Sequence, residues 1–349
     1  MVNYSSIEKY KQLSSQYVNR LQNIINDIDI VAIKWDYTDY LYPFSDLDFR
    51  VVLNDNEVDF FQINKKLFDT QIELQAETIN NQRIFEHPPG FIFFKKEIEQ
   101  IYIEDFRTWC YAGGKLSDFE RFKFLLSKQS TFDENFYLKI IAKRFKKFSF
   151  ATEYASFSKK DMIDYHAYCI LWHYYFPCMF ALASLNAKKS VCRKVDSNRI
   201  QDKYIKNIFD LLVGKRKVSH LNEADLIAAV DTDVENRFDN TKFKMISSAR
   251  KPNVYETLAM LRCRLARLYL YLSEDGVDRR YLAEREINEL GLIFGTISYY
   301  YASDIVNEAN SIINSCDSAL DVLRNLLIHM LSNKHYYNSI MNCSIGVFL

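Results

Sequence analysis

The chain has 349 residues, enough for two domains of ordinary size, and its 48% hydrophobic and 26% charged residues exclude an intrinsically disordered protein. Lysine and arginine together number 45, and aspartate and glutamate also number 45, so net charge gives no general attraction to nucleic acid, although a local basic groove is not excluded. The seven cysteines are odd in number and lack C-x-x-C spacing, which argues against a disulfide framework or a zinc site and favours reduced thiols in a cytoplasmic protein.

The N-terminal part of the chain predicts a helix followed by two strands. Apolar residues recur at helical spacing over residues 5–27, and an apolar strand candidate follows at residues 30–36. A second strand is predicted over residues 46–53. The polar N-terminus lacks the pattern of a signal peptide, which also leads us to expect a cytoplasmic protein.

The second strand begins with the acidic segment Ser45-Asp46-Leu47-Asp48. Because side chains alternate between the faces of a strand, we expect Asp46, Asp48 and Arg50 on one face and the intervening apolar side chains in the core. Two neighbouring carboxylates repel each other, and a cation held between them removes that cost. Oxygen ligands of this kind suit Mg²⁺. The alternative interpretation is a solvated turn that caps a neighbouring segment.

This segment resembles the signature of the nucleotidyltransferase superfamily, which includes DNA polymerase beta and the aminoglycoside nucleotidyltransferases. The signature reads G-S-x-x-x-G-x-x-S-D-h-D before a hydrophobic strand, and Ser45-Asp46-Leu47-Asp48 match its second half fully. The order of helix, strand, turn and acidic strand also agrees. Tyr37-Thr38 fall on the Gly-Ser pair, and Tyr42 falls on the second glycine. Since glycines let backbone amides approach a triphosphate, these two tyrosines predict either a divergent or a degenerate donor site.

The next segments predict a helix and two more strands. The helix is expected over residues 57–80, and the strands over 91–94 and 100–107, joined near residues 97–99. The resemblance implies a third carboxylate on a later strand, and Asp105 or Glu104 is the candidate for it. An ordinary exposed acidic pair at a strand end is the alternative.

The resemblance also implies how the site residues act. Asp46, Asp48 and Asp105, or Glu104 in place of Asp105, would be the catalytic carboxylates that hold Mg²⁺ against the donor triphosphate. Thr38 would contact a phosphate, and Ser45 would either bond a phosphate oxygen or support the turn.

Further along the chain, a basic segment after an apolar helix resembles the stretch that follows a similar helix in members of this superfamily. The resemblance implies that Lys189 or Lys194 could reach the triphosphate as a point charge. The alternative is a basic helix C-terminus that interacts with the helix dipole.

From about residue 130 the chain predicts a helical bundle. We therefore expect an α+β protein in which a nucleotidyltransferase-like catalytic domain with a small mixed sheet, residues 1–129, precedes a helical bundle domain, residues 130–349. The bundle would form the other wall of a cleft for the acceptor. The uncharged stretch from Tyr168 to Leu185 is interpreted as a buried bundle helix and not as a membrane span. The predicted helices cover residues 133–157, 159–186, 200–214, 254–274, 281–312 and 316–334.

Together these features lead us to expect a Mg²⁺-dependent nucleotidyltransferase that moves a nucleoside monophosphate, AMP from ATP in the first instance, to a hydroxyl or amine of a small molecule. Another nucleoside triphosphate is an alternative donor. RNA or protein is an alternative acceptor, as in toxin or defence enzymes, and a non-catalytic nucleotide-binding module is a third possibility. No membrane partner is expected, and the sequence does not indicate an oligomeric state.

Overall fold

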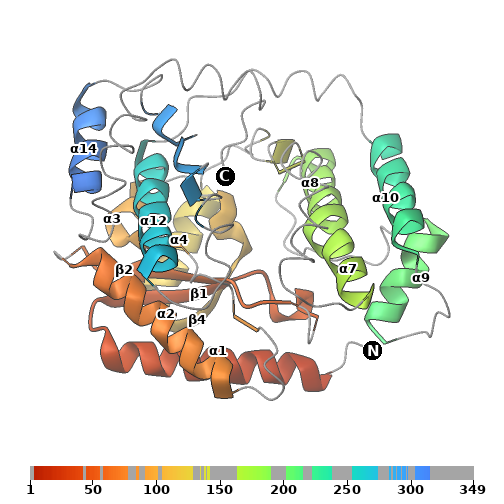
Figure 1. Ribbon diagram of the computed structural model, residues 1–349, viewed down its shortest axis with the longest axis horizontal. Coiled ribbons are helices and arrows are strands. Elements are labelled where there is room, and N and C mark those ends of the chain that lie inside the picture. The colour runs from red at the N-terminus through yellow and green to blue at the C-terminus, as the bar shows by residue number, and fades with distance from the viewer. Residues whose placement is uncertain are drawn as a thin grey trace.

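In the residues that it describes, the computed structural model shows a mixed α and β protein that is mostly helical and has a four-stranded sheet (Figure 1). The continuous stretches that the structure describes are 4–41, 45–55, 58–77, 84–85, 91–100, 104–128, 163–189, 202–214, 222–237, 254–273 and 303–314. It also describes isolated positions and short runs between residues 134 and 141 and between 283 and 297.

Most of the elements predicted in the N-terminal part are confirmed with small shifts at their ends. They are helix α1 (Tyr4–Ile24), strand β1 (Ile28–Lys34), strand β2 (Phe49–Leu53), helix α2 (Phe60–Glu77) and strand β3 (Ile92–Phe94). The fourth strand, β4, covers Trp109–Gly114. The sheet has the order β3-β2-β1-β4, in which β1 pairs antiparallel with β2 and β4, and β2 pairs parallel with β3.

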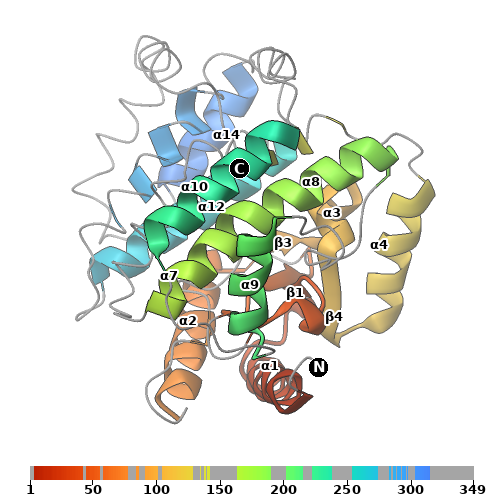
Figure 2. The same cartoon turned by 90° about the vertical axis from the view of Figure 1, so that its right-hand side faces the viewer.

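Helices cover both faces of this sheet. Phe49, Val51 and Leu53 pack in one core with side chains of α1 and α2, as the alternation along β2 predicted. Val52 packs in the opposite core with side chains of helices α3 (Lys95–Gln100) and α4 (Leu116–Lys128). Figure 2 shows α1 and α4 on different sides of β1 and β4.

The prediction of a strand over residues 100–107, joined near 97–99, is wrong. Helix α3 ends at Gln100, and the 3₁₀-helix η3 covers Glu104–Thr108. Local capping explains the helix: Glu97, the third residue of α3, accepts a hydrogen bond from the backbone N–H of Phe94 at 2.8 Å, and Asp55 accepts one from the backbone N–H of Lys96 at 2.8 Å. Side-chain capping therefore forms a helix where the sequence predicted only the connection between two strands.

The C-terminal helices also follow the prediction over much of their length. The predicted segments 159–186, 200–214 and 254–274 are confirmed in their described parts, and 281–312 is helical where it is described. Segment 133–157 lies almost entirely, and 316–334 entirely, outside the described residues. Helix α10 was not predicted. The helices are α7 (Ile163–Cys169), a π-helical segment (Ile170–Tyr175), α8 (Phe176–Ala187), α9 (Lys203–Leu212), α10 (Glu223–Arg237), α12 (Val254–Ser273) and α14 (Ser303–Asn314).

One continuous helix dominates the second half of the fold. In the described part of the chain, His166–Ala187 alone is long and apolar enough to span a membrane, and most of it is buried. It packs with α9 and α10 in a core that includes Trp172, Phe176 and Phe209. The interpretation of this stretch as a buried bundle helix is confirmed.

Helix α12 belongs by packing to the sheet and not to that helical core. Cys263 and Ala266 lie in the same core as α1 and α2, and the Cys263 thiol donates a hydrogen bond to the carbonyl of Ile92 at 3.3 Å. Arg262 forms an ion pair with Glu97 of α3. The helix therefore covers β3, the strand at the sheet edge. Residues beyond the predicted boundary at 129 thus complete the sheet unit.

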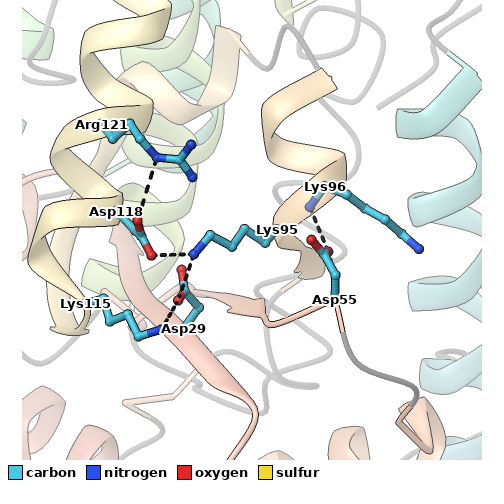
Figure 3. Close-up of polar contacts among 7 residues, drawn as sticks. All are labelled: Asp29, Asp55, Lys95, Lys96, Lys115, Asp118 and Arg121. Carbon is cyan, nitrogen blue, oxygen red and sulfur yellow. Dashed lines mark hydrogen bonds and ion pairs between the residues drawn. The ribbon is translucent and has the colours of Figure 1, made fainter.

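A charge network fixes α3 and α4 at the end of the sheet where β1 begins (Figure 3). The carboxylate of Asp29 is fully buried, and it pairs with the ammonium groups of Lys95 at 3.3 Å and Lys115 at 3.2 Å. Lys95 also donates to Asp118 at 2.5 Å, and Asp118 pairs with Arg121 at 3.7 Å. One lysine from α3 thus links β1 with α4.

This network predicts how stability depends on pH. The hydrogen bond from Lys95 lowers the pKa of Asp118 below its ordinary 3.8. A lowered folded-state pKa contributes stability above the unfolded-state pKa and loses it as pH falls through the folded-state pKa. We expect Asp118→Asn to lower the free energy of unfolding by about 1 kcal/mol near neutral pH. Urea unfolding should show this difference shrinking below about pH 4; a difference that grows on acidification would contradict the assignment.

The same network sets an alkaline limit. Burial disfavours the charged form of Lys95, but the hydrogen bond to Asp118 and the charge of Asp29 outweigh burial and raise the pKa of Lys95 above 10.5. The resulting stability is present below that value and is lost as pH rises through the folded-state pKa.

Candidate functional site

The acidic segment lies at the end of the sheet where β1 ends and where β2 and β4 begin. The backbone N–H of Lys34, at the end of β1, donates to the carbonyl of Asp48 at 2.8 Å. The next N–H, of Trp35, donates to the carbonyl of Thr108 at 2.7 Å, directly before β4. Asp46 and Asp48 are both partly exposed. The sheet thus places two carboxylates at an edge that solutes can reach.

Ser45 fixes the start of this segment through hydrogen bonds of its buried side chain and of its carbonyl. Its side chain is buried, and its Oγ accepts hydrogen bonds from the Leu41 N–H at 2.8 Å and from the Tyr168 hydroxyl at 2.9 Å. Its carbonyl accepts a hydrogen bond from the Tyr10 hydroxyl at 2.7 Å. Of the two roles that the sequence left open for Ser45, this geometry corresponds to support of the turn.

Burial and the negative charge of the acidic pair raise the pKa of two buried tyrosines. Burial and then the negative charges of Asp48 and Asp46 raise the pKa of Tyr40 well above 10.0. Burial and then the charge of Asp46 likewise raise the pKa of Tyr168. Both phenols therefore stay protonated and donate hydrogen bonds, Tyr40 to the carbonyl of Lys34 at 2.5 Å. Both carboxylates therefore lie near enough to the Tyr40 hydroxyl to act on it electrostatically.

The turn before the acidic segment is held by Asp36. Its carboxylate caps the 3₁₀-helix η1 (Tyr37–Asp39) and accepts hydrogen bonds from the N–H of Thr38 at 2.8 Å and from its hydroxyl at 2.5 Å. Thr38 is exposed. Tyr42, the residue at the second glycine position, lies outside the described residues.

Trp35 turns the chain sharply at the end of β1, and sequence reasoning missed it. Its φ of 73° is left-handed, a strained conformation for a bulky residue. Its ring meets the ring of Phe180 on α8 edge-on, with centroids 4.9 Å apart. Side-chain packing against a distant helix holds this conformation, and no local sequence signal reveals it.

The candidates for the third carboxylate lie on a 3₁₀-helix and not on a strand. Glu104 and Asp105 open η3, which enters β4 at the same sheet edge through Thr108. The expectation of a strand is wrong here because the strand begins only at Trp109. The side chains of both acids lie outside the part that the structure describes. Among the residues described, no group of three or more His, Cys, Asp and Glu side chains could hold a metal ion.

The described part of the basic segment after α8, Lys188 and Lys189, ends the helix far from the acidic pair. The backbone of Lys188 is in the left-handed conformation, with a φ of 51°. The N–H of Lys188 donates to the carbonyl of Leu185, and the N–H of Lys189 donates to the carbonyl of Ser184. This pattern is a Schellman helix end. Lys189 is exposed and lies about 30 Å along the helix from Tyr168, at 1.5 Å per residue. Lys194 lies outside the described residues. The placement of Lys189 fits the interpretation as a helix terminus.

Comparisons with models of known protein families, with curated proteins and with solved structures found no match to this chain. They neither support nor oppose the resemblance of the acidic segment to the nucleotidyltransferase signature.

Proposed function

We propose that the protein is a Mg²⁺-dependent nucleotidyltransferase that transfers AMP from ATP to a hydroxyl or amine of a small molecule. The observation that carries the proposal is the pair Asp46 and Asp48, which is partly exposed directly before β2 and whose two charges both act on the hydroxyl of Tyr40. The order α1, β1, η1 and β2 around this pair agrees with the resemblance of the sequence.

The two carboxylates of the pair are of the ligand type that a hard divalent cation takes. Carboxylate oxygens are the ligands that Mg²⁺ prefers, and it is usually held by one or two carboxylates together with substrate phosphates. Asp46 and Asp48 would supply the protein ligands, with Asp105 or Glu104 of η3 as a third. When bound, the cation would neutralise negative charge that develops around the α-phosphate.

The transfer itself exchanges one bond at phosphorus for another. The acceptor oxygen or nitrogen attacks the α-phosphorus, the bond between that phosphorus and the bridging oxygen to the β-phosphate breaks, and pyrophosphate leaves. The acceptor proton passes to a base. The hydroxyl of Thr38, exposed on η1, is the group that we assign to a donor phosphate.

Calorimetry and pyrophosphate release test this proposal. Purified protein should bind ATP in the presence of Mg²⁺ and should release pyrophosphate with at least one acceptor from a panel of small hydroxyl and amine compounds. Parallel reactions with tRNA and with a protein lysate, followed by labelled nucleotide, detect a macromolecular acceptor. Nucleotide binding without release under all these conditions would favour a non-catalytic binding module, and absence of nucleotide binding would overturn the proposal.

A further inference from the structure

Tyr168 connects the helical core to the acidic segment. It lies on α7, its ring is almost fully buried, and its hydroxyl donates to the Oγ of Ser45 at 2.9 Å. That oxygen also accepts the N–H of Leu41 at 2.8 Å. Ser45 directly precedes Asp46, so the hydrogen bond from the Tyr168 hydroxyl to Ser45 positions the backbone next to Asp46.

Further contacts fix the helix that carries Tyr168. The indole N–H of Trp172, one turn further on, donates to the carbonyl of Asp39 in η1 at 3.3 Å, and the rings of Tyr168 and Trp172 are stacked 5.1 Å apart. The Trp35–Phe180 contact adds a third attachment. Trp172 lies in the π-helical segment, an irregularity that often occurs at functional sites. Helices α7 and α8, which Figure 1 shows side by side, therefore hold the chain at three points before the acidic pair.

We infer that Tyr168 is a positioning residue for the acidic pair, which orients Asp46 for a divalent cation through its hydrogen bond to Ser45. The inference rests on the proposed function. Groups that orient metal ligands typically change metal affinity by about 10- to 100-fold when they are removed. The second half of the fold would thus contribute to the metal site without supplying a ligand.

The test is the affinity of the full chain for Mn²⁺, a spectroscopic substitute for Mg²⁺, measured by electron paramagnetic resonance. We expect Tyr168→Phe to weaken Mn²⁺ binding about tenfold or more. Tyr174→Phe is the matched control, because Tyr174 lies on the same helix, is equally buried and loses a hydroxyl bond to Asp231 of α10 at 2.8 Å. It should leave Mn²⁺ affinity unchanged. Ser45→Ala should reproduce the loss, and the Tyr168→Phe/Ser45→Ala double variant should lose no more than either single variant.

Amide exchange gives a second measurement on the same variants. Tyr168→Phe should speed exchange at the Leu41 amide, whose acceptor is Ser45, whereas Tyr174→Phe should not. Unchanged Mn²⁺ affinity in folded Tyr168→Phe would overturn the inference and leave the proposed function standing. A wild-type protein that binds neither Mn²⁺ nor nucleotide would overturn both.

Discussion

Replacing Asp48 by asparagine is expected to lower the rate of Mg²⁺-dependent pyrophosphate release by about a thousandfold. A divalent cation contributes several kcal/mol to charge stabilisation in such a reaction, and each ~1.4 kcal/mol corresponds to a factor of ten. Asparagine keeps the size of the side chain but removes its charge. It also keeps the backbone carbonyl that accepts the Lys34 N–H. The variant should therefore fold normally, and kcat/KM with ATP measures the loss.

The control for Asp48→Asn is Asp69→Asn. Asp69 is an exposed aspartate on α2 whose carboxylate pairs with Lys65, four residues earlier, at 3.2 Å. Removing that charge should change neither activity nor Mn²⁺ affinity, since exposed pairs contribute little. Equal pyrophosphate release by Asp48→Asn and wild type would remove Asp48 from the proposed site.

Replacing Lys95 by methionine is expected to lower the free energy of unfolding by about 3 kcal/mol. Lys95 is 21% exposed and lies between the carboxylates of Asp29, which is fully buried, and Asp118. Among the described residues, removing it leaves the buried carboxylate paired with Lys115, which is 58% exposed and therefore well solvated. Breaking a buried pair costs more than the pair contributes because one charge remains in a poorly solvated place. Urea unfolding at neutral pH measures the change.

Two further variants separate charge from packing at this site. Lys65→Met removes a lysine from an exposed pair and should cost at most about 0.5 kcal/mol. Adding Asp29→Asn to Lys95→Met removes the buried charge and should restore part of the lost stability. If the double variant is less stable than Lys95→Met, the cost does not arise from the charge of Asp29.

The acidic site was partly predictable because its signal is local. The two-residue spacing of Asp46 and Asp48, and the apolar strand after them, needed only the periodicity of the chain, although the strand begins at Phe49 and not at Asp46. The role of Ser45 could not be read from the sequence, because its partner Tyr168 lies 123 residues away. Trp35 was missed for the same reason, since Phe180 on α8 packs against it.

The errors arise where local and distant interactions compete. Apolar alternation favoured a strand over residues 100–107, but capping by Glu97 and Asp55 fixed α3 immediately before it, and η3 followed. The sequence left two interpretations open for Lys189, and the length of the buried helix carries it about 30 Å from Tyr168.

The sequence by itself determined the helix, strand, turn and acidic strand at the N-terminus, and the buried apolar helix of the second half, because hydrophobic periodicity acts over a few residues. The tertiary structure alone decided that α12 completes the sheet unit and that Tyr168 and Trp172 hold the acidic segment. Those contacts join residues more than a hundred positions apart, and packing and hydrogen bonds between such residues exist only once the chain has folded.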